Sequence, residues 1–116
     1  QYGDRCDLLN PKNVARVLAL IRSGGVCAIL IGLPTQSWSR ARRNDGRGPG
    51  PLRDDKDFLF GLDDLSLKDY LKVFTGNRLL EIACRIIKEA IQLKILWILE
   101  NPKTSRVWIT PHISKL

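Results

Sequence analysis

The sequence predicts a small three-layer α/β domain with a short, mainly parallel sheet and a long basic loop. Two short apolar runs, 26–31 and 95–99, have the length of buried strands. A long amphipathic stretch separates them, which is the arrangement of a strand–helix–strand unit with parallel strands. The segment 32–65 has no sustained period and is rich in arginine, glycine and proline, so we expect a loop there.

The chain is predicted to form a single domain over 1–116. It has 116 residues, of which 44% are hydrophobic and 27% are charged, as in an ordinary globular protein with a modest core. No apolar run approaches the roughly 20 residues of a transmembrane helix, and no signal sequence opens the chain. We therefore expect an intracellular protein without a membrane partner, in a compartment that the sequence does not name.

The first helix is predicted to begin at Pro11. Asn10 is a suitable N-cap, and proline is favoured at the first helical position. One apolar face continues to Arg22, after which a Ser-Gly-Gly turn over 23–25 ends the helix. The apolar face consists of Val14, Val17, Leu18, Leu20 and Ile21.

The first strand, 26–31, is an unbroken apolar run, so we expect it to be buried on both faces as in a parallel sheet. It ends at Gly32, and Pro34 then restricts the backbone. Four hydrogen-bonding side chains follow at the carboxyl end of the strand, where open α/β sheets bind ligands. These are Thr35, Gln36, Ser37 and Ser39.

Positive charge is concentrated in the loop 32–65. Its arginines are Arg40, Arg42, Arg43, Arg47 and Arg53. Two interpretations are open: a solvated surface loop, or a segment that grips phosphates, for which the planar guanidinium group is suited. Trp38 precedes the arginines, and its ring either stacks on an unpaired base, the role we favour, or anchors the loop to the core.

A second, longer helix is predicted after Ser66, which forms a capping box with Asp69. Its apolar residues recur at helical spacing, and Gly76 marks a break or a close-packing point. The strand 95–99 follows and ends in Glu100-Asn-Pro, parallel to the first strand. Thr35 and Glu100 are then expected at the carboxyl ends of adjacent strands, where a pocket forms.

The net charge of +7, from 19 Lys and Arg against 12 Asp and Glu, favours polyanionic partners such as nucleic acid or a large ribonucleoprotein, although solubility alone also explains such an excess.

Cys6, Cys27 and Cys84 are far apart, and we expect the last two to be buried thiols, not metal ligands or a disulfide. His112 is the only histidine, so a histidine metal cluster or a Ser-His-Asp triad lacks its residues, and no metal is expected.

Two motifs, in this order, resemble those of cytosine-C5 DNA methyltransferases. In that family one strand ends in Pro-Cys-Gln followed by a Phe-Ser-like step, and a later strand ends in Glu-Asn-Val. Here the first strand leads into Gly32-Leu-Pro-Thr-Gln-Ser-Trp-Ser-Arg-Ala, and the second ends in Glu100-Asn-Pro. Gly3 and Asp4 are similar to a Gly-Asp step of the family. The resemblance covers Gly3 to Arg106, the middle of a full enzyme, and we expect the domain to be Rossmann-like.

The resemblance implies roles for single residues. In the family the cysteine thiolate adds to C6 of a flipped-out cytosine, and the glutamate bonds the N3 edge and exocyclic amine of the ring. Glu100 matches that glutamate, and Thr35 stands at the position of the nucleophile. Gln36 and Ser39 match the loop that holds the base. The residues that we expect to contact nucleic acid are Gln36, Trp38, Ser39, Arg40, Arg42, Arg43, Arg47, Arg53 and Arg106.

The chain also departs from the family pattern. A threonine hydroxyl is a far weaker nucleophile than a thiolate, and no histidine lies near Thr35 in the sequence to activate it. Nothing before Val26 supplies the strand and glycine-rich turn that bind S-adenosylmethionine. The loop 32–65 is longer than the usual connection, and Pro102 replaces valine. We therefore predict a domain that binds DNA or RNA, without catalytic activity and without a cofactor.

Two alternatives stay open. The chain is an active nucleic-acid methyltransferase fragment if a missing segment or a partner chain completes the S-adenosylmethionine site. It is instead a structural subunit if the basic loop serves to assemble a larger protein or ribonucleoprotein complex.

Overall fold

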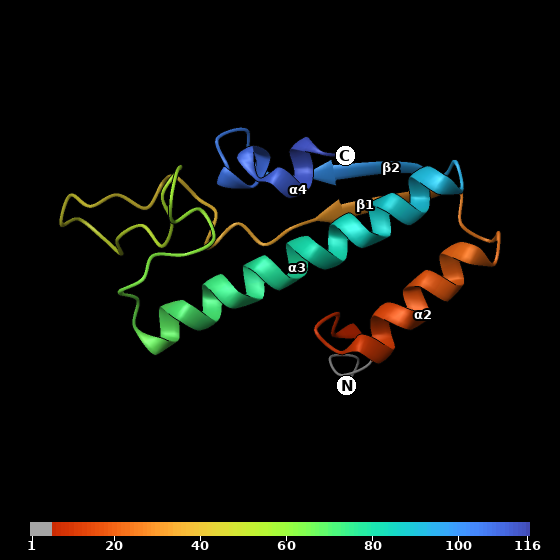
Figure 1. Ribbon diagram of the computed structural model, residues 1–116, viewed down its shortest axis with the longest axis horizontal. Coiled ribbons are helices and arrows are strands. Elements are labelled where there is room, and N and C mark those ends of the chain that lie inside the picture. The colour runs from red at the N-terminus through yellow and green to blue at the C-terminus, as the bar shows by residue number, and fades with distance from the viewer. Residues whose placement is uncertain (1–5) are drawn as a thin grey trace.

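The computed structural model describes residues 6–116, so the Gly3-Asp4 step lies outside the described residues. The chain alternates helices and strands (Figure 1). In order, the elements are helix α2 (Pro11–Arg22), strand β1 (Ala28–Gly32), helix α3 (Leu67–Gln92), strand β2 (Leu96–Glu100), the 3-10 helix η1 (Arg106–Ile109) and helix α4 (Pro111–Ser114). The predicted mixture of helix and strand in a small α/β fold is confirmed.

Strands β1 and β2 pair in parallel, as predicted from the helix between them. Their register runs from Ala28 opposite Leu96 to Gly32 opposite Glu100. Each strand begins and ends one or two residues later than the apolar run that predicted it. Both carboxyl ends therefore lie at the same end of the sheet (Figure 1).

The predicted helix limits agree with the structure because the capping signals are local. The side chain of Asn10 accepts a hydrogen bond from the backbone N–H of Lys12 at 3.0 Å, and Pro11 is the first helical residue of α2. Ser66 Oγ accepts from the backbone N–H of Asp69 at 3.2 Å and caps α3. Along 6–116 no helix is both long and apolar enough to cross a bilayer.

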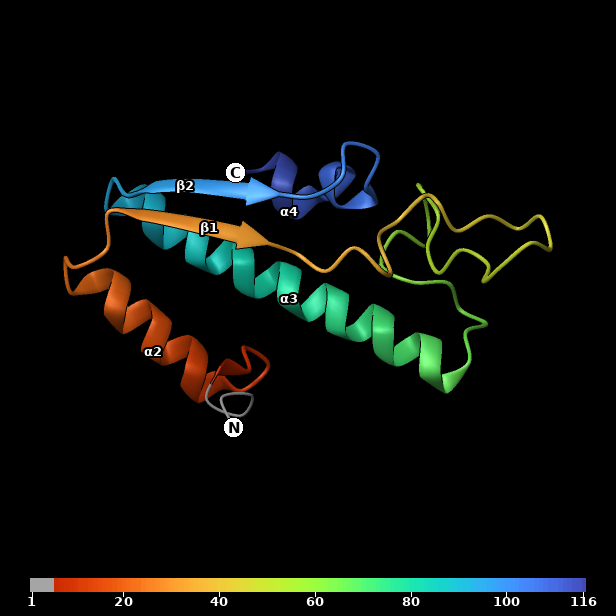
Figure 2. The ribbon, with the colours of Figure 1, turned by 180° about the vertical axis from the view of Figure 1, so that it is seen from behind.

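Helices α2 and α3 lie on the same side of the two strands (Figures 1 and 2). Apolar side chains of both helices pack together there and against the inner face of β1. This cluster contains Val14, Leu18, Ile21, Ile82 and Ile86, with Ile29 and Ile31 from β1. Trp97 on β2 is partly buried.

The outer face of the sheet is exposed. Leu30, Leu96 and Ile98 have 74%, 63% and 53% of their surface accessible. The prediction that the first strand is buried on both faces is wrong, because alternate strand residues point to opposite faces and no described element covers the outer one. The described residues thus supply two layers of the predicted three.

A second apolar cluster lies where the loop, α3 and the C-terminal helices meet. It contains Leu33, Trp38, Leu80, Ala83, Cys84 and Val107. Cys84 is buried as predicted, and burial raises the pKa of its thiol. Cys27 is exposed, so the prediction of a buried thiol there is wrong: the residue precedes β1, outside the sheet.

Candidate nucleic-acid interface

Segment 33–66 contains no helix or strand, yet a buried arginine organises it. The Cζ atom of Arg53 lies 3.4 Å from the centroid of the Trp38 ring, and the two residues are 1% and 0% exposed. Every nitrogen of the guanidinium group donates a hydrogen bond. The acceptors are the backbone carbonyls of Ser37, Leu59 and Val73 and the side-chain oxygens of Ser37 and Asn77, at 2.6–3.2 Å.

The structure corrects the predicted roles of Trp38 and Arg53 in binding nucleic acid. A base cannot stack on a ring that is fully covered, nor can a phosphate reach a guanidinium group enclosed by protein acceptors. Within residues 6–116 no carboxylate pairs with Arg53, and burial together with the nearby positive charge of Arg106 lowers its pKa to about 9. The cation–π contact and the five hydrogen bonds offset the cost of burying this charge. The pair holds the loop onto α3.

Gly76 allows this contact to form. A Cβ atom at position 76 would lie 2.5 Å from Ser37 Oγ, 2.9 Å from Arg53 Nη2 and 3.1 Å from Trp38 Nε1. The glycine therefore does not break α3, which runs straight through it. It is the close-packing point that was one of the two predicted roles.

Asn101 joins the ends of the two strands. Its Nδ2 donates to the backbone carbonyl of Leu33 at 2.9 Å, and the residue is 8% exposed. Just before it, Glu100 pairs with Gly32, and a Cβ atom on Gly32 would lie 3.8 Å from Glu100 Oε2. The carboxylate thus lies over the end of β1 on the exposed side of the sheet.

A turn at the end of β1 separates exposed from buried side chains. The backbone carbonyl of Thr35 accepts hydrogen bonds from the N–H groups of Trp38 at 3.0 Å and Ser39 at 2.9 Å. Ser37 and Trp38 are buried, while Thr35 and Gln36 are exposed. Within 6–116 the Thr35 hydroxyl and the Glu100 carboxylate make no hydrogen bond or ion pair, so both are open to a ligand at the same end of the sheet.

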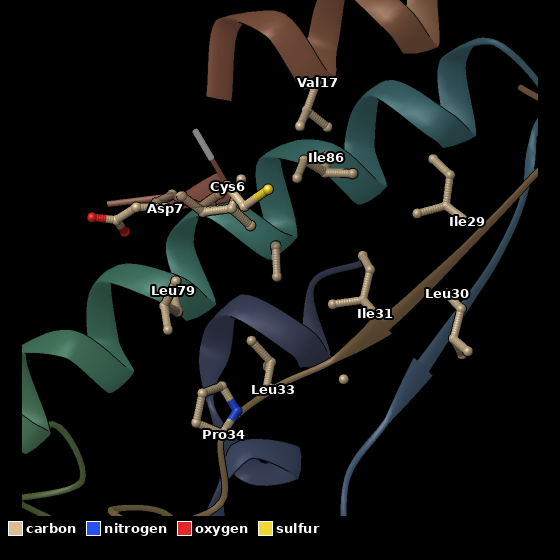
Figure 3. A pocket seen from close by; sticks show the side chains of 14 residues that line it. Cys6, Asp7, Val17, Ile29, Leu30, Ile31, Leu33, Pro34, Leu79 and Ile86 are labelled. Atoms are coloured by element: carbon tan, nitrogen blue, oxygen red, sulfur yellow. The ribbon is translucent and has the colours of Figure 1, made fainter. Parts of the chain in front are cut away.

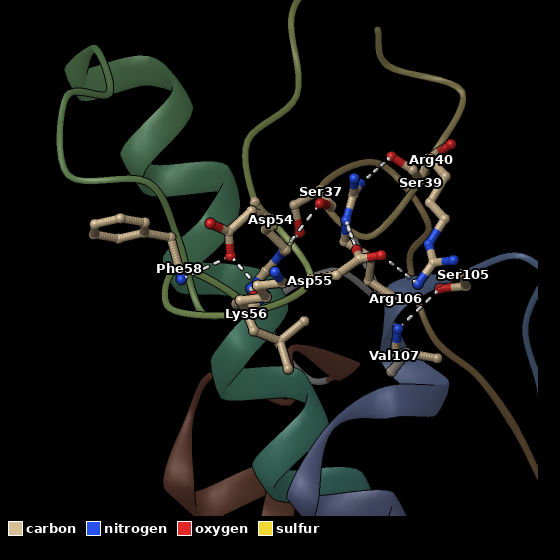
Figure 4. A network of polar contacts seen from close by, with 12 residues as sticks. Ser37, Ser39, Arg40, Asp54, Asp55, Lys56, Phe58, Ser105, Arg106 and Val107 are labelled. Atoms are coloured by element: carbon tan, nitrogen blue, oxygen red, sulfur yellow. Dashed lines mark hydrogen bonds and ion pairs between the residues drawn. The ribbon is translucent and has the colours of Figure 1, made fainter.

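Asp55 binds two of the predicted phosphate-binding arginines. Arg106 Nε donates to Asp55 Oδ1 at 2.8 Å, and Arg40 Nη2 lies 3.0 Å from Asp55 Oδ2 (Figure 4). Arg106 also donates from Nη1 to the carbonyl of Ser39 at 3.1 Å, and its side chain is 13% exposed. Arg106 therefore fastens the C-terminal segment to the loop. Its guanidinium group can contact a nucleic-acid phosphate, as predicted, only if these bonds break.

Three predicted arginines remain at the tip of the loop. Arg42, Arg43 and Arg47 surround a hollow of about 270 Å³ together with Asp45. Arg42 Nη1 donates to the carbonyl of Gly50 at 3.2 Å, whereas the guanidinium groups of Arg43 and Arg47 have no partner in the described part of the chain. Ser39 Oγ is occupied by the backbone N–H of Ala41 at 3.1 Å. The loop tip is thus the part of the predicted interface with free positive charge.

An apolar groove of about 490 Å³ lies between β1, α2 and α3 (Figure 3). Val17, Ile29, Ile31, Leu79 and Ile86 line it, as do Cys6 and Asp7. It reaches Pro34, one residue before Thr35, but contains none of the predicted site residues. Within the described residues no group of three His, Cys, Asp or Glu side chains could hold a metal ion.

Sequence reasoning missed four residues: Asp55, Asn101, Lys68 and Lys72. The two lysines belong to α3 and line a pocket together with Gln36. The signal for the lysines was their spacing of four, which places two charges on one helical face beside the loop. Asn101 was noticed only as part of a motif. Its role in joining the strand ends depends on a contact across 68 positions, which no local pattern reveals.

Comparisons of this chain with protein-family models, with curated proteins and with solved structures find no match.

Proposed function

We propose that this chain is a nucleic-acid-binding domain that resembles the central part of a cytosine-C5 DNA methyltransferase and does not transfer methyl groups. The observation that carries the proposal is that the free Glu100 carboxylate and the exposed Thr35–Gln36 turn both lie toward the common carboxyl end of two parallel strands. We propose further that the fold is three-layered and Rossmann-like. The exposed Leu30, Leu96 and Ile98 support this, since a third layer would cover them.

The free charges of the loop tip support binding to a polyanion. Arg43 and Arg47 have no acceptor within 6–116, and Arg42 is held only by a backbone carbonyl. Guanidinium groups bind phosphate oxygens in a bidentate manner, and the net charge of +7 attracts such a partner at long range. In this arrangement the arginines bind phosphates, and the Thr35–Glu100 end of the sheet faces a base.

The chemistry of Thr35 argues against methyl transfer. Addition to C6 of cytosine needs a thiolate, and a hydroxyl whose pKa is far higher than that of a thiol is not converted to an anion without a base. Glu100 is able to bond the edge of a base with or without that nucleophile. The proposed domain therefore keeps recognition and lacks the covalent step.

The test is a titration of labelled single-stranded and duplex oligonucleotides, as DNA and as RNA, over a salt series. We expect an affinity that falls steeply with salt, because released counterions drive binding. We also expect preference for cytosine over thymine strands, by about tenfold, which Glu100→Gln removes. Glu81→Gln, an exposed change on α3, is the matched control. Absence of binding at low salt would overturn the proposal.

Two other functions each have one supporting observation. Strand β1 pairs only with β2 in the described residues, so its other edge could accept a strand of a cofactor-binding segment, as an active methyltransferase fragment requires. Calorimetric binding of S-adenosylmethionine would favour that function and make Thr35→Cys the next variant to assay.

The exposed outer face of the sheet favours a structural subunit of a larger protein or ribonucleoprotein assembly. Aggregation of the isolated chain, together with a lack of oligonucleotide affinity, would support this function.

A further inference from the structure

A second pocket lies beside the strand ends, between the first half of α3 and the turn after β1. It has a volume of about 320 Å³. Pro34, Gln36, Lys68, Leu71, Lys72 and Thr75 line it. None of these α3 residues belongs to the predicted interface, but Gln36 is shared with it.

The close approach at Gly76 builds this pocket. Because position 76 has no side chain, the Ser37–Trp38 turn packs directly on α3, and this carries Gln36 to the helix surface. The anchoring hydrogen bond from Arg53 Nη2 to Ser37 Oγ, at 2.9 Å, holds the turn there. The pocket is therefore a fixed feature of the folded loop.

The lining combines an apolar floor with two positive charges. Lys68 and Lys72 are four residues apart, so they lie on the same face of α3 with Leu71 between them. Lys72 Nζ is 3.6 Å from Asp69 Oδ1, whereas Lys68 makes no ion pair within the described residues. Leu71, Pro34 and the lysine stems supply apolar surface, and Thr75 and Gln36 supply hydrogen-bonding groups.

We infer that this pocket holds one nucleotide of a bound strand, with its phosphate on Lys68 and Lys72 and its base against Leu71 and Pro34. A nucleotide combines an apolar ring face with a charged phosphate, which is the combination that the lining complements. Gln36 contacts this nucleotide, and the neighbouring nucleotide faces Thr35 and Glu100. The inference rests on the proposed function, because it adds a subsite to the same interface.

The first measurement is oligonucleotide affinity over a salt series for the double variant Lys68→Gln/Lys72→Gln. Each lost phosphate contact reduces the slope of log K against log salt by about 0.7 for a single strand. We expect an affinity about fivefold lower for each lysine at moderate salt. Lys88→Gln, an exposed lysine further along the same helix, should bind within about twofold of the wild type, and circular dichroism should show all variants folded.

The second measurement locates the strand directly. Acetylation of surface lysines, read by mass spectrometry with and without an oligodeoxythymidine, should show protection of Lys68 and Lys72 and none of Lys12 on α2. If the wild type binds but the double variant binds equally well and neither lysine is protected, the subsite is refuted and the proposed function stands. If the wild type does not bind at all, both fail.

Discussion

The guanidinium carbon of Arg53 lies over the ring of Trp38, 3.4 Å from its centroid, and both side chains are buried. A positive charge at the centre of a loop usually points to solvent. Here it holds the loop together, because its donors satisfy the backbone carbonyls of Ser37 and Leu59, which a segment without helix or strand leaves unpaired. A further donor reaches the carbonyl of Val73 on α3. The order of the candidate interface therefore depends on this pair.

Replacing Arg53 by methionine should destabilise the domain by on the order of 3 kcal/mol. The change leaves five hydrogen bonds unmade, four of them buried and one part-buried, and removes the cation–π contact. Urea denaturation gives the free energy of unfolding. Arg47→Gln at the exposed loop tip is the control and should change it by less than about 0.5 kcal/mol. Equal midpoints for both variants would contradict a structural role for Arg53.

Gly76→Ala should lower the thermal midpoint although alanine favours helices. The gain in helix propensity is about 1 kcal/mol. The new Cβ would approach Ser37 Oγ and the tightly held Arg53 to less than 3.0 Å, and overpacking of this kind costs about 1–3 kcal/mol. Gly48→Ala, where no atom lies within 4 Å of the added carbon, should leave the midpoint unchanged or slightly higher. A Gly76→Ala domain more stable than the wild type would show that the loop does not pack as described.

The Arg22–Glu89 pair predicts a dependence of stability on pH. This pair links α2 to α3, and the hydrogen bond from Arg22 lowers the pKa of the Glu89 carboxyl. The folded state therefore binds the Glu89 proton less readily than the unfolded state, so the contribution is present above the ordinary carboxyl pKa of 4.5 and is lost as the pH falls below it. Glu89→Gln should make the stability curve shallower on the acid side. The double variant Arg22→Gln/Glu89→Gln should match the single one; a further change would point to another partner of Arg22.

Neutralising the loop tip should weaken nucleic-acid binding without affecting the fold. The triple variant Arg42→Gln/Arg43→Gln/Arg47→Gln removes two exposed charges and the partly exposed Arg42, whose one hydrogen bond is itself exposed to solvent, so the free energy of unfolding should stay within about 0.5 kcal/mol. If all three contact phosphates of a single strand, the slope of log K against log salt should fall by about 2. Fluorescence anisotropy over a salt series measures this slope. An unchanged slope would place the phosphates elsewhere on the surface.

Local patterns in the sequence predicted the elements that depend on neighbours along the chain. Asn10 and Ser66 mark helix starts by contacts to residues two or three positions away. The parallel pairing also followed, because two strand-like runs joined by a helix have few other arrangements. These parts of the fold follow from the sequence by short-range physics.

Burial of individual side chains was less predictable. Trp38 and Arg53 are enclosed by groups from Ser37, Leu59 and Asn77, which come together only when the loop folds onto α3. Leu30 is exposed because no described element covers the outer face of the sheet. An apolar run in the sequence does not reveal whether another element covers it. The arginines were correctly located in a loop, but their partners depend on distant residues such as Asp55.

The bond between Asn101 and Leu33 also bears on how the domain folds. It spans 68 positions, and the strand pairing next to it closes a chain segment of similar length. Helix α3 is able to form from local contacts within microseconds, whereas closing so long a loop carries an entropic penalty that must be met before any strand contact is gained. We therefore expect the end of the sheet that holds Thr35 and Glu100 to form later than α3. A chain arrested before that step would have a complete α3 and no interface.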